Sequence, residues 1–223
     1  MLRSLETAAL GMQAQQTNVD NTANNLANAN TTGFKESRVV FQDLLYETVE
    51  GTDASQDSTG GADQPSTLQI GHGATAVATV RNFSTGGFQE TGNQLDVAIA
   101  GRGFMQVRRP DGSIAYTRDG NLTTDGQGRI MTQSGLPLQP NLSVPEGTTR
   151  IEISNDGVVN AYVQGDSSAV DIGQIELTRF SNPGGLEAIG SNLYEATDSS
   201  GRPIFGTPGT DGLGQIRQGF LEQ

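Results

Sequence analysis

The chain lacks cysteine and tryptophan, has little aromatic content (5%), and contains a single lysine, Lys35, among its 13 basic residues. Without cysteine, disulfides and thiolate metal sites are excluded. There is no apolar run of about eighteen residues, so no transmembrane helix is predicted, and no secretory signal peptide is expected at the N-terminus. The net charge is −12 and the arginines are scattered, so we expect neither a nucleic-acid partner nor insertion into a membrane.

Motifs for enzymatic chemistry are missing as well. The sequence has no Walker A motif, no GxGxxG and no GxSxG nucleophile elbow. The one histidine, His72, lies between two glycines, which is typical of a loop and not of a catalytic triad. Alternate residues from Asp119 to Asp125 resemble an EF-hand calcium loop, but Thr124 and Ile130 stand where that loop needs Gly and Glu. We predict no enzyme activity, no catalytic, metal or cofactor-binding residues, and no cofactor.

Glycine is abundant instead, with 30 residues, whereas apolar residues make up 34%. This composition is typical of a β protein with many short strands. From residue 68 onward, short alternating segments are separated by turn residues. Leu95–Ala100 is predicted to be a half-buried strand. Arg109–Ser113 is predicted to be a tight turn between strands at 104–108 and 114–118, because Pro, Asp and Gly each favour turn conformations. Asp125–Gly128 is predicted to be a further turn, between strands at 121–124 and 129–133.

A second set of strand-like segments follows a proline-containing stretch at residues 136–148. The sequence Asn155–Gly157 predicts a turn into a strand at 158–164, and Gln174–Phe180 alternates as a further strand. We therefore predict a meander-type β domain in two parts, residues 68–145 and residues 146–223.

The N-terminal stretch is organised differently, because two sets of residues recur in it every seven positions. The sets are Leu5, Met12, Val19 and Leu26, and, three positions ahead, Leu2, Ala9, Gln16 and Ala23. In an α-helix both sets lie on one stripe, which is narrow, like the seam of a coiled coil. We predict a helix from about Arg3 to Asn28, about 39 Å long at 1.5 Å per residue, ending before Gly33.

Two interpretations of this stripe remain open. A single amphipathic helix commonly packs on its own domain. No other long helix is predicted in the chain, however, so the stripe has no evident helical mate and is interpreted as an assembly surface. Its predicted interface residues are Leu2, Leu5, Ala9, Met12, Val19, Ala23 and Leu26.

Between the helix and the β domain, residues 35–67 are predicted to be extended and partly disordered. The first dozen residues fit either a short helix or an extended arm, and residues 47–66 are polar and small, as in a linker. Overall, we expect a mainly β protein with a long N-terminal α-helix, in which the extended segment joins the assembly helix to the β domain.

One segment resembles a known signature. Asn24–Lys35 (NNLANANTTGFK) is similar to the signature of the bacterial flagellar rod and hook family. The residues that carry it are Asn24, Asn25, Leu26, Asn28, Thr32, Gly33 and Phe34. Further segments look like the distal rod members of that family in particular: Phe41–Tyr46, Asp96–Phe104, Tyr116–Gly120, Gly185–Tyr194 and Gln218–Glu222. The resemblance covers essentially the whole chain.

The resemblance implies a structural subunit of the flagellar basal-body distal rod, the drive shaft that transmits torque from motor to hook. Residues 1–34 then serve polymerisation and export, through the flagellar type III apparatus and without a cleaved signal peptide. The implied partners are further copies in a helical homopolymer, other rod proteins, the hook protein, the surrounding ring proteins and the export apparatus. The implied location is the basal body where it spans the periplasm. A proximal rod or hook member of the family is the alternative.

Two further expectations concern the closing helix of the family and an alternative class of function. In the family, the chain continues past Glu222 into a closing helix that pairs with the N-terminal one, whereas the present sequence stops at Gln223. Without that helix, residues 1–33 are expected to be mobile in the monomer and polymerisation to be impaired. The hypothesis from a different class is a secreted β-rich binding module that uses the helix as an oligomerisation handle.

Overall fold

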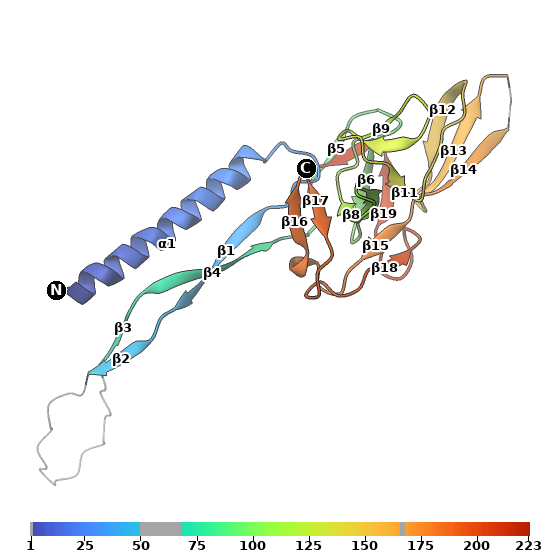
Figure 1. Ribbon diagram of the computed structural model, residues 1–223. Helices are drawn as coiled ribbons and strands as arrows, with labels where there is room; N and C mark the ends of the chain where they lie inside the picture. The colour runs from blue at the N-terminus through green and yellow to red at the C-terminus, as the bar shows by residue number, and fades with distance from the viewer. Residues whose placement is uncertain (1, 50–67, 166–167) are drawn as a thin grey trace, which may run out of the picture. The chain divides into compact units, whose positions relative to one another are not determined.

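The computed structural model describes residues 2–49, 68–165 and 168–223. In these ranges one long helix is followed by many short strands in small antiparallel sheets (Figure 1), which confirms the mainly β fold class. The chain divides into two compact units, residues 1–26 with 37–80, and residues 27–36 with 81–223. Within the described ranges, no helix has both the length and the apolar character needed to cross a membrane.

Helix α1 spans Leu2–Ala27, within one residue of the predicted bounds. Its interior holds no proline and one glycine, so little in the sequence interrupts it. The chain then turns: the Thr31 amide donates to the Asn28 carbonyl at 2.9 Å, and Gly33 adopts a φ of +68°. Glycine reaches this left-handed conformation without the steric cost that other residues incur, which explains why the turn is placed there.

The first unit also contains a long two-stranded ribbon. Its strands are β1 (Ser37–Asp43), β2 (Tyr46–Val49), β3 (Leu68–Gly71) and β4 (Ala74–Arg81). Strand β1 pairs with β4, and β2 pairs with β3. The segment after the helix is therefore extended and not helical. Residues 50–67, which include most of the predicted linker, lie outside the described part of the chain.

Polar bonds hold α1 to this ribbon. The side-chain amides of Asn21 and Asn25 both donate to the Ser37 carbonyl, at 2.6 and 2.7 Å. In return, the Ser37 amide donates to the Asn25 side-chain oxygen at 3.1 Å. At the other end of the helix, Arg3 forms an ion pair with Glu47. The signature residue Asn25 thus fixes the helix to the first strand.

The second unit contains sixteen of the described strands. They are β5 (Phe88–Glu90), β6 (Val97–Ala100), β7 (Met105–Arg108), β8 (Ile114–Thr117), β9 (Leu122–Thr124), β10 (Ile130–Thr132), β11 (Leu138–Gln139), β12 (Thr148–Ile153), β13 (Val158–Val163), β14 (Ala169–Gln174), β15 (Leu177–Arg179), β16 (Glu187–Gly190), β17 (Leu193–Glu195), β18 (Ile204–Gly206), β19 (Gln215–Gln218) and β20 (Phe220–Glu222). A single 3₁₀ turn, Pro183–Gly185, precedes β16.

Several of the predicted hairpins are confirmed. Strands β7 and β8 pair antiparallel around the Arg109–Ser113 turn, in which the Asp111 carboxylate accepts from the Ser113 amide at 2.9 Å. Strands β9 and β10 pair across the turn at 125–128, and β12, β13 and β14 form a three-stranded meander. These pairings are local in sequence, so the turn residues alone were enough to predict them.

Two expectations were wrong. Strand β6 is not half-buried: Val97, Ala98 and Ile99 are all buried, because the residue between the two larger side chains is alanine and both faces of the strand are apolar. The main sheet is also not a simple meander. Its order is β11-β7-β8-β17-β16, in which β17 arrives from much later in the chain to pair with β8.

One apolar core joins the two predicted parts of the β domain. Leu138 and Leu142, from the proline-containing stretch, pack in the same cluster as Ile99, Ile151 and Val159. A smaller aromatic cluster lies beside it, with edge-to-face ring contacts at centroid distances from 4.8 to 5.9 Å. Its rings are Phe83, Phe104, Tyr116, Phe180 and Tyr194.

Candidate assembly surface

The predicted seam of α1 faces solvent. Leu5, Met12, Val19 and Leu26 are 66%, 69%, 64% and 77% exposed, respectively. Ala9 and Ala23 are exposed as well, whereas the side chain of Leu2 lies outside the described part. Large apolar side chains are seldom left this open along one face of a helix, so the stripe is a candidate contact surface.

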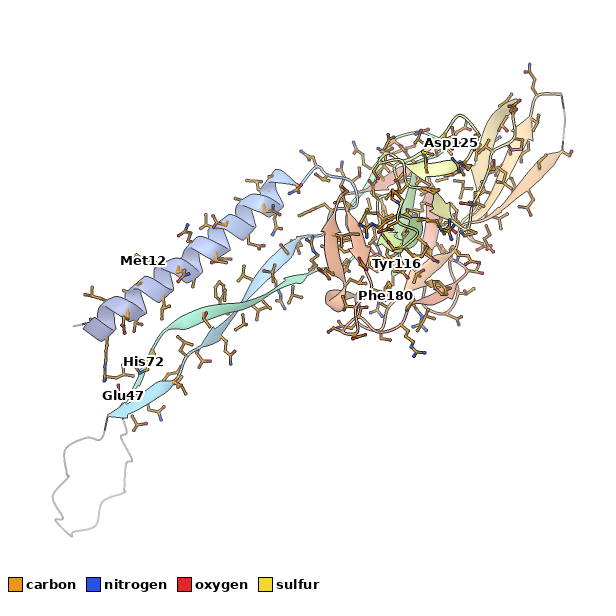
Figure 2. All side chains as sticks on the ribbon, viewed as in Figure 1. Met12, Glu47, His72, Tyr116, Asp125 and Phe180 are labelled. Carbon is orange, nitrogen blue, oxygen red and sulfur yellow. The ribbon has the colours of Figure 1, made fainter. Side chains whose placement is uncertain are left out.

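The opposite face of α1 packs against the strands of the first unit. Leu10, Ala14 and Thr17 face a small cavity whose other wall is strand β4, at Ala74–Ala76. Figure 2 places Met12 on the helix and Glu47 and His72 on the ribbon. The helix therefore packs on its own unit through this face, one of the two interpretations left open, while the predicted stripe has no mate among the described residues. The seven-residue spacing identified the open stripe, but the covered face is partly polar and gave no comparable signal.

The ribbon adds to the exposed apolar surface of the first unit. Phe41, Leu45, Tyr46, Ile70 and Val77 are all exposed, with Leu45 the most open at 85%. Together with the four residues of the seam, the described residues of the first unit carry nine exposed large apolar side chains, against four among those of the second unit. The sequence of Phe41–Tyr46 indicated only a resemblance to rod proteins, whereas the structure shows that three of its apolar side chains are exposed.

The end of the signature is anchored on the second unit. The Thr32 hydroxyl donates to the Asp119 carboxylate at 3.0 Å, and the Asn192 side-chain amide donates to the Thr32 carbonyl at 2.8 Å. The Gly33 amide donates to the Glu222 carbonyl at 3.0 Å. Gly33 lies so close to Asp119 that a Cβ would stand 2.7 Å from the Asp119 nitrogen. A residue without a side chain is therefore required.

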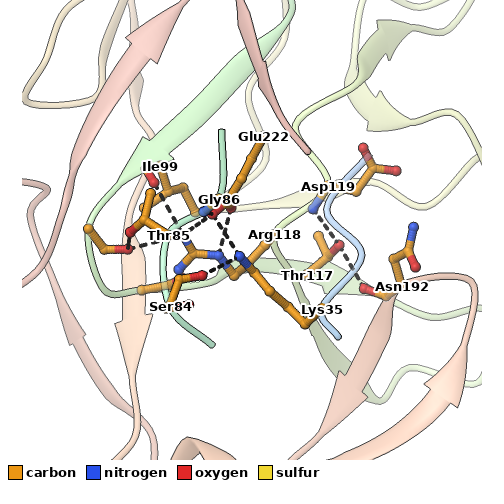
Figure 3. Close-up of polar contacts among 12 residues, drawn as sticks. Lys35, Ser84, Thr85, Gly86, Ile99, Thr117, Arg118, Asp119, Asn192 and Glu222 are labelled. Atoms are coloured by element: carbon orange, nitrogen blue, oxygen red, sulfur yellow. Dashed lines mark hydrogen bonds and ion pairs between the residues drawn. The ribbon is translucent and has the colours of Figure 1, made fainter. Parts of the chain in front are cut away.

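A buried charged cluster lies directly beyond this anchor, where Lys35, Arg118 and Glu222 meet (Figure 3). The Lys35 ammonium donates to the Glu222 carboxylate at 2.7 Å and to the Ser84 carbonyl at 2.7 Å. The Arg118 guanidinium donates to both Glu222 oxygens, at 2.8 and 3.1 Å. It also donates to the carbonyls of residues 99, 101 and 103, at 3.2, 3.0 and 2.9 Å respectively.

The cluster contains two cations and one carboxylate, so it is held together by its hydrogen bonds as much as by charge. The Gly86 amide is a further donor to Glu222, at 2.9 Å. Burial lowers the pKa of the Lys35 ammonium, although its bond to Glu222 acts in the opposite direction. Burial also raises the pKa of the neighbouring Asp119 carboxyl. The cluster links the signature to the loop at 84–86 and to the last strand, β20.

The signature residues are thus divided between two anchors. Asn25 bonds to strand β1, while Thr32 and Gly33 bond to the second unit; Leu26 stays exposed, and Asn24 and Asn28 also take part in interactions. Sequence reasoning noted the segments that contain Arg118 and Glu222 only for their resemblance, and missed that these two residues meet Lys35 in a buried cluster. One feature of the sequence could have pointed to the cluster: the single lysine of the chain, Lys35, lies at the end of the signature.

The Glu222 carboxyl gives this cluster a specific pH dependence. Burial alone would raise its pKa, but the bonds from Arg118 and Lys35 outweigh burial and lower the pKa below the ordinary 4.5. Because the folded-state pKa is the lower one, this stabilisation is complete above the unfolded-state pKa and is lost as pH falls through the folded-state pKa. We expect the difference in unfolding free energy between wild type and Glu222→Gln to be constant near neutral pH and to shrink below pH 4.5. Urea unfolding across that range measures it, and a difference that grows toward acid pH would contradict it.

Comparisons with known proteins give a match for the N-terminal helix with its signature and another for the β domain. Residues 5–35 match the family described as flagella basal body rod protein, and residues 98–161 match the flagellar hook protein FlgE/F/G D1 domain. The chain is 46% identical over 224 residues to the flagellar basal-body rod protein FlgG of Buchnera aphidicola subsp. Acyrthosiphon pisum, covering 100% of this chain and 85% of that protein.

Two proteins of Caulobacter vibrioides distinguish between members of the family. The flagellar basal-body rod protein FlgG is 43% identical over 221 residues, covering 99% of this chain and 84% of that protein. The flagellar basal-body rod protein FlgF is 33% identical over 221 residues, covering 96% and 79%. The similarity to the FlgG protein is therefore clearly the greater of the two.

A rod-type N-terminal helix and signature, followed along the chain by a hook-type β domain, define a structural protein of the flagellar rod and hook class. Within that class, the chain belongs to the FlgG family of flagellar basal-body rod proteins, and it is a structural subunit of the distal rod and not an enzyme. This placement also sets aside the hypothesis of a secreted binding module.

Proposed function

We propose that copies of this chain polymerise helically through the exposed stripe of α1, and that the ribbon contributes further apolar contacts. The observation that carries the proposal is the concentration of exposed large apolar side chains on the first unit, nine against four in the second unit among the residues that the structure describes. Burying them between copies removes apolar surface from water, at about 25 cal/mol per Å². The heptad spacing of Leu5, Met12, Val19 and Leu26 fits a neighbouring helix.

The finer features of the function belong to the same proposal. The polymer is the distal part of the drive shaft that transmits torque from motor to hook, and it crosses the periplasm. Its further partners are the other rod proteins, the hook protein and the surrounding rings. Subunits reach it through the flagellar export apparatus without a cleaved signal peptide, with residues 1–34 serving both export and polymerisation. The domain boundaries at 34/35, 67/68 and 145/146 stay predictions.

The test replaces one seam residue and its immediate neighbour with the same charged residue. Val19→Glu places a carboxylate in the stripe, whereas Asn18→Glu places it one residue away, at an exposed position off the stripe. We expect Val19→Glu to abolish incorporation into basal bodies and Asn18→Glu to retain it, because a buried unpaired carboxylate is costly in an apolar contact. Quantification of the chain in purified basal bodies measures the outcome.

Both substitutions lie on the helix surface, so each is expected to change the stability of the monomer by no more than about 0.5 kcal/mol. Urea unfolding of the two purified variants controls for that. If Val19→Glu enters basal bodies as efficiently as Asn18→Glu, the stripe is not the assembly surface.

A further inference from the structure

A cavity of about 520 Å³ opens within the second unit, next to the charged cluster. Phe83, Phe104 and Phe180 form its apolar wall, with the ring of Phe104 edge-to-face against each of the other two at 5.3 and 5.9 Å. Arginine side chains supply the polar part of the lining, from Arg102, Arg118 and Arg179. The cavity therefore combines aromatic surface with several guanidinium groups.

These arginines are not equivalent. Arg118 is fully engaged by Glu222 and by backbone carbonyls, as described above. Arg102 and Arg179 form no ion pair with any carboxylate of the described residues. Moreover, the Arg179 Nε is buried without a hydrogen-bond partner in the described part of the chain. A buried guanidinium nitrogen left unpaired costs free energy, so Arg179 is the least satisfied of the three arginines that line the cavity.

The chemistry of the missing acceptor follows from the lining. A guanidinium presents donors in a planar fork that matches a carboxylate, and such bonds strengthen where water is excluded. Aromatic walls suit the methylene stem of an acidic side chain. The chain carries 25 acidic residues against 13 basic ones, so a second copy presents many carboxylates and few competing cations.

We propose that this cavity is a socket for an acidic side chain of a second copy of the chain, with Arg179 and Arg102 binding its carboxylate. The socket gives the assembly a polar, directional contact in addition to the apolar stripe of α1. Charge pairs of this kind fix register and exclude wrong partners. The inference rests on the proposed polymerisation, but it concerns a different surface on a different unit.

The single lysine of the chain makes a direct test available. Within residues 1–223, the only side-chain amine is that of Lys35, which is 4% exposed. Arg179→Lys and Arg102→Lys each place a new amine in the cavity, and a carbodiimide joins it as an amide to a carboxylate in direct contact. Arg202→Lys is the matched control, at an exposed position outside the cavity. Basal bodies are isolated from cells making each variant, treated with carbodiimide and examined by mass spectrometry, with mixed isotope labelling to separate links between copies from links within one.

We expect one dominant link between copies from position 179 or 102, always to the same acidic residue, and no such dominant link from position 202. Links within one chain only, or scattered links equal to those of the control, would overturn the socket. A link to a different protein would overturn the second copy as the occupant.

A second measurement uses loss of charge. Arg179→Gln is expected to lower the incorporation of the chain at limiting expression at least about tenfold, whereas Arg202→Gln changes it less than about twofold. If Arg179→Gln behaves like Arg202→Gln while Val19→Glu is excluded from basal bodies, the socket fails and the helical assembly surface stands. If Val19→Glu is incorporated normally, the proposed assembly surface fails, and the links from position 179 then decide separately whether copies meet at the cavity.

Discussion

Glu222→Gln is expected to destabilise the second unit by about 3–5 kcal/mol, because the change removes the only carboxylate of a buried cluster that keeps two cations. Glutamine has nearly the same shape, so packing is conserved and the loss is electrostatic. Lys35 and Arg118 then remain buried side by side without the carboxylate that neutralises them in the wild type. Urea unfolding followed by the near-ultraviolet circular dichroism of Tyr116 and Tyr194 reports on this unit, since both rings lie in its aromatic cluster.

The asymmetry of the cluster gives a second comparison. Lys35→Met removes one of two cations and leaves Arg118 and Glu222 as a matched pair with two direct bonds. Its cost is therefore expected to be smaller than that of Glu222→Gln, although the Ser84 carbonyl loses its donor. A larger cost for Lys35→Met would mean that the ammonium, and not the carboxylate, organises the cluster.

Glu195→Gln is the matched control for the glutamate change. Glu195 is half-exposed, at 48% of its side chain, and its partner Arg109 is 3.8 Å away. Exposed pairs of this kind contribute about 0–1 kcal/mol. If Glu222→Gln lowers the free energy of unfolding no more than Glu195→Gln does, the buried cluster does not stabilise the second unit.

The sequence predicted those parts of the structure that depend on neighbours along the chain. The seven-residue spacing located α1 and its open stripe, and turn residues located the β7–β8 and β9–β10 hairpins. The pairings of β17 with β8 and of β19 with β6 join segments far apart in sequence, and no local pattern records them. For the same reason, Asp119 and Asn192 were not recognised as anchors of the signature.

The charged cluster illustrates why the rest was inaccessible. Glu222 is one of 25 acidic residues, and nothing in its immediate sequence distinguishes it from those at the surface. Its role depends on Lys35, 187 residues away, and on Arg118, 104 residues away. The half-buried prediction for β6 was wrong for a related reason: alternation with alanine is compatible with burial on one face or on both, and tertiary packing decides between them.

Gly33→Ala is expected to cost about 2–4 kcal/mol, since two penalties coincide at this position. The first is the left-handed conformation, with a φ of +68°, which a side chain disfavours. The second is the close approach of Asp119, whose backbone nitrogen and Cα would stand 2.7 and 2.8 Å from the new Cβ. Backbone atoms yield less readily than the end of a flexible side chain, so the signature itself must shift. That shift would break the bond from the Gly33 amide to Glu222.

Gly112→Ala separates the two penalties. Gly112 also has a positive φ, +86°, but nothing lies within 4 Å of its Cβ position. Its substitution should therefore cost only the conformational part, about 1–2 kcal/mol. The excess at Gly33 measures how tightly the signature is held on the β domain, and hydrogen exchange at Phe34 and Lys35 should rise in Gly33→Ala alone. Equal costs and unchanged exchange at the two positions would mean that the close approach to Asp119 contributes nothing, and that the signature is held by the charged cluster beyond it.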